Sequence, residues 1–245
     1  MLRVATYNIH SCVGAGGRYD PQRVISVARE MDADILALQE IGGYAVEGGE
    51  QVDFFERELQ LAVTAGPNLR RRQTQFGNAL FVKGRVVETR LIDLTVRPFE
   101  PRGAIDAIVE TENGTTARVI STHLGLLRRE RRLQIGRIGE LLHERSHPLT
   151  IVLGDFNVFG RERTILHRIG APSPLPKLYS FPSWRPLMSL DRLWVIPNDR
   201  LANLRVHRTT LSRGASDHLP LLAEIDPGEP PRQRDEEPRA LERAS

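Results

Sequence analysis

Residues 151–157 read IVLGDFN, a short aliphatic run that ends in a glycine and is followed at once by polar side chains. Three consecutive large aliphatic residues are typical of a strand that is covered on both faces. The glycine and the polar residues after it mark the end of that strand. Where helices and sheets combine, groups at strand ends converge on one edge, and sites tend to form there. Asp155 and Asn157 are therefore candidate site residues.

The same arrangement recurs at other predicted strand ends. The polar residues found there are Asn8, Glu40, His123, Asp191, Asp217 and His218. Carboxylates combined with amides and imidazoles, and without thiolates, suit a hard divalent ion such as Mg²⁺ or Mn²⁺. A histidine among such acids can act as an acid or a base near neutral pH. Any one of these residues alone fits a turn or a cap, but together they predict a metal-dependent catalytic site.

Apolar periodicity predicts strands and helices that alternate along the chain. Strands are expected at residues 2–9, 34–39, 79–82, 86–94, 104–111, 116–123, 149–153, 191–196 and 219–225. Helices are expected at residues 21–31, 52–61 and 128–145, where apolar residues recur with helical spacing. Residues 112–114, Glu-Asn-Gly, are typical of a hairpin turn. Helix–strand units mixed with hairpins predict the α/β (α+β) class, with helices packed on sheets.

The composition is that of a globular protein with a buried core. The chain has 245 residues, of which 40% are hydrophobic and 27% are charged. No apolar run approaches the roughly 18–20 residues of a membrane helix, and the first residues do not resemble a secretion signal. The single cysteine, Cys12, excludes an internal disulfide and a cysteine-rich metal site. We therefore expect a cytoplasmic monomer without stable membrane insertion.

Arginine dominates the basic residues. The formal net charge is +3, and the 34 basic residues include only two lysines, Lys83 and Lys177. Arginines cluster at residues 70–72 and at positions 128, 129, 131 and 132. A guanidinium can grip a phosphate in two places, so the clusters are compatible with a phosphate-bearing partner such as nucleic acid. The codon bias of a GC-rich genome is the favoured explanation of this arginine content, so charge alone does not decide the substrate.

The last residues differ in composition from the rest. Residues 227–245 contain four prolines, many charges and one large aliphatic side chain, Leu241. Such a segment cannot bury enough apolar surface to offset the entropy of ordering it. We predict a catalytic domain at residues 1–226 and a disordered, charged, proline-rich tail at residues 227–245.

Five short motifs in this order resemble a known family. They are Thr6-Tyr7-Asn8-Ile9, Leu38-Gln39-Glu40, Ser121-Thr122-His123-Leu124, Gly154-Asp155-Phe156-Asn157 and Ser216-Asp217-His218-Leu219-Pro220. Each is weak alone, but their order and spacing are similar to those of the endonuclease/exonuclease/phosphatase superfamily, the group of deoxyribonuclease I. The resemblance implies a four-layer αββα sandwich, in which two mainly antiparallel sheets pack face to face with helices outside and the site at one edge.

The resemblance also assigns the metal-binding positions. Glu40 corresponds to the principal Mg²⁺ ligand, with Asn8 beside it and Asp217 nearby. Asp155 and Asn157 correspond to the pair that positions the attacking water and the scissile phosphate. Mn²⁺ is expected to substitute for Mg²⁺. A second, weak metal site, formed by Asp155, Asn157 and His218, is left open.

Further site residues follow from the same resemblance. His218 corresponds to the histidine that binds the phosphate or acts as general base, and Asp191 to the carboxylate that orients it. His123 corresponds to a phosphate contact or leaving-group acid. Arg102, and with less support Asn78, correspond to residues on the substrate-phosphate side.

These residues predict a Mg²⁺-dependent phosphoesterase that hydrolyses phosphodiester bonds, with a nuclease favoured. The alternatives are a phosphatase, a phospholipid or sphingomyelinase-type phosphodiesterase and, least favoured, a non-catalytic binding module. A nuclease requires a long basic groove, whereas a lipid enzyme usually has an apolar loop for membrane contact. Residues 181–188 could be such a loop, although we expect them to pack in the core.

Overall fold

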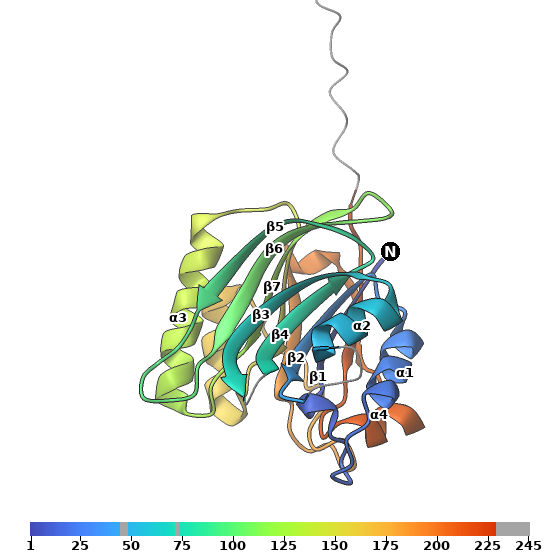
Figure 1. The fold of residues 1–245 in the computed structure, drawn as a ribbon. Helices are drawn as coiled ribbons and strands as arrows, with labels where there is room; N and C mark the ends of the chain where they lie inside the picture. The colour runs from blue at the N-terminus through green and yellow to red at the C-terminus, as the bar shows by residue number, and fades with distance from the viewer. Residues whose placement is uncertain (45–48, 72–73, 229–245) are drawn as a thin grey trace, which may run out of the picture.

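The computed structural model describes residues 1–44, 49–71 and 74–228, and its strands form two sheets with helices outside them (Figure 1). The strands are β1 (Leu2–Asn8), β2 (Ile35–Gly42), β3 (Ala62–Arg71), β4 (Thr74–Val82), β5 (Gly84–Asp93), β6 (Gly103–Thr111), β7 (Thr116–His123), β8 (Thr150–Asp155), β9 (Asp191–Ile196), β10 (Leu201–Val206) and β11 (Leu221–Ile225). The α-helices are α1 (Pro21–Met31), α2 (Gln51–Leu59), α3 (Arg128–Glu144) and α4 (Thr210–Ala215). Three 3-10 helices are η1 (His10–Cys12), η2 (Gly160–Ile169) and η3 (Asn198–Arg200).

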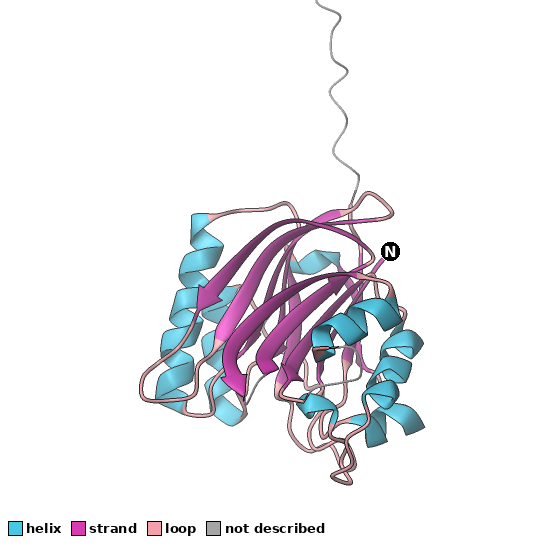
Figure 2. Ribbon diagram, viewed as in Figure 1, coloured by secondary structure: helices cyan, strands magenta, loops and turns pink. Residues whose placement is uncertain are grey.

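The two sheets pack face to face between helical layers, as Figure 2 shows. One sheet has six strands in the order β10-β11-β1-β2-β4-β3, and the other has five in the order β5-β6-β7-β8-β9. In the described part of the chain, each sheet contains one parallel pair, β1–β2 or β7–β8, and the remaining pairs are antiparallel. The predicted four-layer αββα sandwich is confirmed.

Strand β1 illustrates how the sequence builds these layers. Val4 packs in the core between the sheets, whereas Ala5 and Tyr7 pack against the core beneath the helices. Because both faces of the strand are covered, almost every residue of β1 is buried. The five-stranded sheet is covered on its outer face in the same way, by an apolar layer that includes Ile138 of α3 and Leu166 of η2.

Helix α1 begins and ends where its sequence provides the signals. The side chain of Asp20 accepts a hydrogen bond from the backbone N–H of Arg23, and Pro21 occupies the first turn. Val24 and Met31 lie on the buried face of the helix. At the other end, Asp32 adopts a left-handed conformation that terminates the helix.

The strand pairing brings the candidate site residues to one edge of the sandwich. In the parallel pair β7–β8, His123 lies opposite Asp155, and in the antiparallel pair β8–β9, Asp155 lies opposite Asp191. In the other sheet, Asn8 at the end of β1 lies opposite Gln39, the residue before Glu40. The two sheets therefore present acids, amides and a histidine at the same end of the molecule.

Several elements differ from the sequence prediction. Strands β3 and β10 and helices η2 and α4 were not predicted, and β2 and β4 extend beyond their predicted bounds. In β3, the run Gly66-Pro67 suggests a turn, yet the strand continues through it with a register shift after Pro67. Strand β10 has no clear alternation, because it is a partly exposed edge strand.

Two predictions concern parts of the chain that the structure does not describe. The predicted tail lies outside the described residues except for Pro227 and Gly228, so the division into a domain and a tail stays a prediction. The side chains of the arginine cluster at residues 70–72 also lie outside the description. Among the described residues, no helix is both long enough and apolar enough to cross a membrane.

Candidate active site

A cavity of about 480 Å³ opens at the edge where the strand ends meet. One part of its lining is polar and includes Glu40, Arg102, His123, Asp155, Asn157 and His218. The rest is largely apolar and includes Phe76, Leu126, Phe159, Phe181, Met188 and Leu190. These six polar residues are those expected from the sequence, whereas Glu100, Arg131 and the apolar wall were not predicted.

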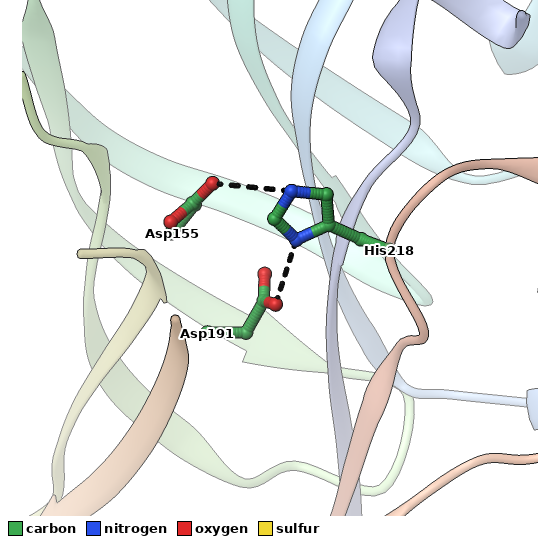
Figure 3. Close-up of side chains that lie close together, drawn as sticks. All are labelled: Asp155, Asp191 and His218. Atoms are coloured by element: carbon green, nitrogen blue, oxygen red, sulfur yellow. Dashed lines mark hydrogen bonds and ion pairs between the residues drawn. The ribbon is translucent and has the colours of Figure 1, made fainter. Parts of the chain in front are cut away.

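His218 and Asp191 form a buried pair beside this cavity (Figure 3). The Nδ1 atom of His218 lies 2.9 Å from Oδ2 of Asp191, and the hydroxyl of Ser180 donates to the same carboxylate oxygen. Burial alone would disfavour the charged ring, but the carboxylates of Asp191 and Asp155 outweigh it and raise the pKa of His218 to about 10. The two carboxylates therefore favour the protonated form of the His218 ring.

Asp155 is the hub of the polar cluster. Its Oδ2 accepts a hydrogen bond of 3.0 Å from the amide of Asn8 and lies 3.6 Å and 3.7 Å from Nε2 of His123 and His218. Its Oδ1 accepts from the backbone N–H of Asn157. The preceding Gly154 has a φ of +139°, and a Cβ there would lie 1.9 Å from the carbonyl oxygen of Thr122. Only glycine fits this position of β8, which explains the glycine before Asp155.

His123 is held in the opposite protonation state to His218. The guanidinium of Arg102 lies 3.3 Å from Nδ1, and the amide nitrogen of Asn157 lies 3.2 Å from Nε2. That amide nitrogen also donates to the carbonyl of Leu124, which fixes its orientation. Burial, and to a smaller extent the charges of Arg102 and His218, lower the pKa of His123 to about 3 despite the opposing effect of Asp155. A neutral ring suits hydrogen bonding to a phosphate better than proton donation.

Glu40 and Asn8 connect the other sheet to this cluster. Glu40 adopts a φ of +57° and lies where the pairing of β2 with β4 shifts register, between Leu38 and Ile41. The amide nitrogen of Asn8 donates both to Glu40 at 3.1 Å and to Asp155 at 3.0 Å, so two carboxylates face one amide group. Oxygen ligands of this kind fit a hard divalent cation. A second group, Asp155, Asp191 and His218, brings three potential ligand atoms within 4.8 Å of one another.

The remaining predicted residues lie at different distances from this cluster. Arg102 lines the cavity and is 7% exposed, with Nε buried and unpartnered. Asn78 is buried and donates to the carbonyl of Gly103, so it contacts the strand that follows Arg102 and does not line the cavity. The carboxylate of Asp217 lies 3.7 Å from Nδ1 of His10 and accepts from the hydroxyl of Ser216, which also donates to the backbone carbonyl of Asn8.

Two residues that support the site were not predicted from the sequence. Ser180 donates to Asp191 and thereby holds the carboxylate that orients His218, but it lies in a segment without a motif. Arg131 lines the cavity, pairs with Glu162 and places its guanidinium 6.0 Å from the ring centre of Phe159. It had been noted only as one of a run of arginines, because nothing in that run distinguishes its buried member.

The two histidines are expected to limit stability at opposite ends of the pH scale. Between the ordinary histidine pKa of 6.5 and about pH 3, His123 binds a proton in the unfolded chain but not in the native protein. The free energy of unfolding therefore falls as the pH falls through this range. Between pH 6.5 and about pH 10, His218 keeps its proton in the native protein but loses it in the unfolded chain. The free energy of unfolding therefore falls as the pH rises through this range. Each residue contributes a slope of at most about 1.4 kcal/mol per pH unit.

Urea unfolding with EDTA present, at about pH 5, 7 and 9, measures these slopes. His123→Gln should flatten the acid limb only, and His218→Gln should flatten the alkaline limb only. Equal effects of both variants on both limbs would show that the assigned protonation states are wrong.

A cavity of carboxylates, amides, imidazoles and a buried arginine at the edge of an αββα sandwich defines a metal-dependent hydrolase of phosphoester bonds. Residues 5–218 match the Endonuclease/Exonuclease/phosphatase family, and the chain belongs to this family. The predicted family membership and enzyme class are confirmed.

Solved structures support the fold. An endonuclease/exonuclease/phosphatase from Beutenbergia cavernae is 18% identical with a TM-score of 0.70, over 91% of this chain and 70% of that one. The catalytic domain of human Nocturnin with bound sulfate is 22% identical with a TM-score of 0.67, over 92% and 94%. A mannosyl-6-phosphatase from Bacteroides thetaiotaomicron is 17% identical with a TM-score of 0.68, over 92% and 100%. A comparison with curated protein sequences finds no match.

Proposed function

We propose that the protein is a Mg²⁺-dependent phosphodiesterase in which Asp155 activates the attacking water. The observation that carries this proposal is the position of Asp155, whose carboxylate contacts Asn8 and faces the Nε2 atoms of both His123 and His218. The carboxylates of Asp191 and Asp155 raise the pKa of His218 and favour its protonated form, which suits the role of general base less well than a free carboxylate does. Asp155 is then the group beside the phosphate that can accept the proton from water.

The other residues are assigned to binding the phosphate. The imidazolium of His218, held by Asp191, is a charged donor for a phosphate oxygen. Arg102 adds a second positive charge, and His123 and Asn157 add neutral hydrogen bonds. Mg²⁺, bound by Glu40 with Asn8 and Asp217 as further candidates, supplies positive charge that offsets the charge on the phosphate and the leaving oxygen. Mn²⁺ as a substitute, and a second metal near Asp155, Asn157 and His218, belong to the same proposal.

The substrate is a phosphodiester, for which the sequence favours nucleic acid. Arginines beside the cavity and the pairing of His123 with Arg102 are consistent with binding a phosphate backbone. A lipid phosphodiester is the second candidate, and one observation favours it: Trp184 is 64% exposed and Leu187 is 62% exposed on the loop 181–188, next to the cavity. The expectation that this loop packs in the core is wrong for these two residues.

A panel of substrates with Mg²⁺ tests the proposal. We expect hydrolysis of bis-p-nitrophenyl phosphate, a minimal diester that requires only the catalytic groups. Supercoiled plasmid, single-stranded DNA, RNA, sphingomyelin, phosphatidylinositol phosphates and small phosphomonoesters then identify the natural class. Nicking that weakens steeply with salt would support a nuclease. Turnover of phosphomonoesters without any diester would contradict the phosphodiesterase assignment and favour the phosphatase alternative.

The same proposal includes a monomer located in the cytoplasm. A non-catalytic binding module is disfavoured because the acids, amides and histidines required for chemistry are all present along the cavity. Such modules are expected to lack one or more of these groups.

A further inference from the structure

Large apolar side chains are exposed on two sides of the cavity mouth. Leu126 is 69% exposed, Leu127 is 50% exposed and Phe159 is 55% exposed, next to the start of α3 and of η2. Across the cavity, the loop 181–188 exposes Trp184 and Leu187. These five residues are here called the apolar rim. Leu126 and Phe159 line the cavity, as do the two ends of the loop, whereas Leu127, Trp184 and Leu187 lie outside its lining. An exposed apolar patch around a cavity is typical of an interaction surface.

The loop 181–188 holds its apolar side chains outward by specific contacts. Its ends are paired, with Phe181 opposite Met188 in an antiparallel bridge. Ser183 is fully buried, and its hydroxyl and backbone N–H bond the carbonyls of Ser216 and Asp217 at 2.7 Å each. With the middle of the loop anchored through Ser183, the exposure of Trp184 and Leu187 follows from the fold.

A basic cleft adjoins the rim on the side of α3. It has a volume of about 250 Å³ and is lined by Arg128, Arg132, Arg161 and Arg168, here called the arginine cleft, together with Glu162, Thr164 and Ile165. The single acid, Glu162, is engaged by Arg131. Within the described parts of the chain, none of the four cleft arginines forms an ion pair or a side-chain hydrogen bond.

The arginines in α3 oppose the local preferences of a helix. Arg128 and Arg132 lie four residues apart near the helix start, where the helix dipole favours acids and like charges at this spacing repel. Residues that conflict with the local preferences of a helix often belong to a functional surface. Unpaired positive charge beside exposed apolar side chains is the pattern of a protein that binds an anionic membrane surface.

We propose that the apolar rim and the arginine cleft dock the protein on an anionic phospholipid bilayer, so that a lipid headgroup phosphoester enters the catalytic cavity. Three of the five rim residues, Leu126, Leu127 and Leu187, are not aromatic. They cannot stack on bases, as the side chains of a nucleic-acid-binding surface do. The apolar wall of the cavity continues the rim inward and suits the glycerol or acyl part of a lipid. This inference rests on the proposed phosphodiesterase function for its chemistry, although docking itself does not.

Vesicle sedimentation tests the docking surface, with EDTA present to prevent turnover. We expect the wild type to bind vesicles of phosphatidylcholine with about 30 mol% phosphatidylglycerol at least about tenfold more tightly than pure phosphatidylcholine. The triple variant Leu127→Ser, Trp184→Ser and Leu187→Ser removes exposed apolar residues that do not line the cavity. Serine is also a favoured N-cap at position 127. This variant should lose at least about tenfold in vesicle affinity.

Charge and apolar controls isolate the surface. The double variant Arg128→Gln and Arg132→Gln should lose the roughly tenfold preference for vesicles that contain phosphatidylglycerol. Lys83→Gln and Val87→Ser remove an exposed charge and an exposed apolar side chain near the opposite ends of the strands, and both should bind like the wild type. Turnover of soluble bis-p-nitrophenyl phosphate should stay within about twofold in the triple variant, since its three residues lie outside the cavity lining.

Each remaining outcome has a defined meaning. Failure of the wild type to bind anionic vesicles, or equal binding by the rim and control variants, would overturn the docking proposal. If the protein bound a labelled single-stranded oligonucleotide through Arg128 and Arg132 and did not bind vesicles, the result would overturn the docking proposal in favour of a nucleic-acid surface. Vesicle binding without any hydrolysis of bis-p-nitrophenyl phosphate would leave docking intact and reject the proposed function.

Discussion

Replacement of Asp155 by asparagine is expected to lower kcat by about 10²–10⁴-fold, the usual loss for a positioned acid–base group. Asparagine has the shape of aspartate but cannot accept a proton from water. The neighbouring histidines are poor substitutes, because Asp191 and Asp155 raise the pKa of His218 and both ring nitrogens of His123 are engaged by Arg102 and Asn157. Hydrolysis of bis-p-nitrophenyl phosphate at saturating Mg²⁺ measures the effect, and circular dichroism checks that the variant folds.

Asp32→Asn provides a matched control for this substitution. Asp32 follows α1, is 68% exposed in its side chain and pairs with Arg3, at the end of the sheet opposite to Asn8. The control should keep kcat within about twofold, since exposed ion pairs contribute little. If folded Asp155→Asn retained kcat within about tenfold of the wild type, Asp155 would not be the group that activates water.

The position of most site residues could be predicted from sequence because each follows a strand that is recognisable on its own. Asn8, Glu40, His123 and Asp155 all terminate short buried runs, and parallel pairing places such ends at one edge. The motif around Asp155 also contains a structural requirement, since Gly154 occupies a position of β8 where a Cβ would collide with the carbonyl oxygen of Thr122.

The protonation states could not be predicted in the same way, because they depend on contacts made across the fold. Both histidines are nearly buried, yet one is cationic and the other neutral. Asp191 contacts His218 directly at 2.9 Å, whereas Arg102 faces His123 at 3.3 Å. These partners lie 27 and 21 residues away in the chain, so no local pattern records them.

The loop 181–188 shows a different limit of sequence reasoning. Phenylalanine, tryptophan, leucine and methionine in one short segment suggest core packing. In the structure, the small residue Ser183 is buried and anchors the loop, while Trp184 and Leu187 face outward. Which side chains are buried was decided by the carbonyl groups of residues 216 and 217, which only the folded chain supplies.

Removal of divalent metal with EDTA is expected to lower kcat/KM for bis-p-nitrophenyl phosphate by on the order of 10³-fold or more. The reason is the charge lining the site. A phosphodiester that enters meets Glu40, Glu100 and Asp155 in the cavity lining and Asp191 just behind it. Arg102 and protonated His218 supply positive charge there, but Arg131 is already paired with Glu162. Without an added cation, the carboxylates repel both the substrate and the charge that develops on the leaving oxygen.

Glu40→Gln separates loss of the metal from loss of the catalytic groups. Glutamine keeps an oxygen toward the site but removes the negative charge, so the Mg²⁺ concentration that gives half-maximal activity should rise by about tenfold or more. At saturating Mg²⁺, its kcat should recover much more than that of Asp155→Asn, because Asp155 and its contacts with Asn8 and both histidines remain. Excess Mg²⁺ or Mn²⁺ added after EDTA should restore the wild type. Full wild-type activity in EDTA would reject the metal requirement and, with it, the role of Glu40 as a metal ligand.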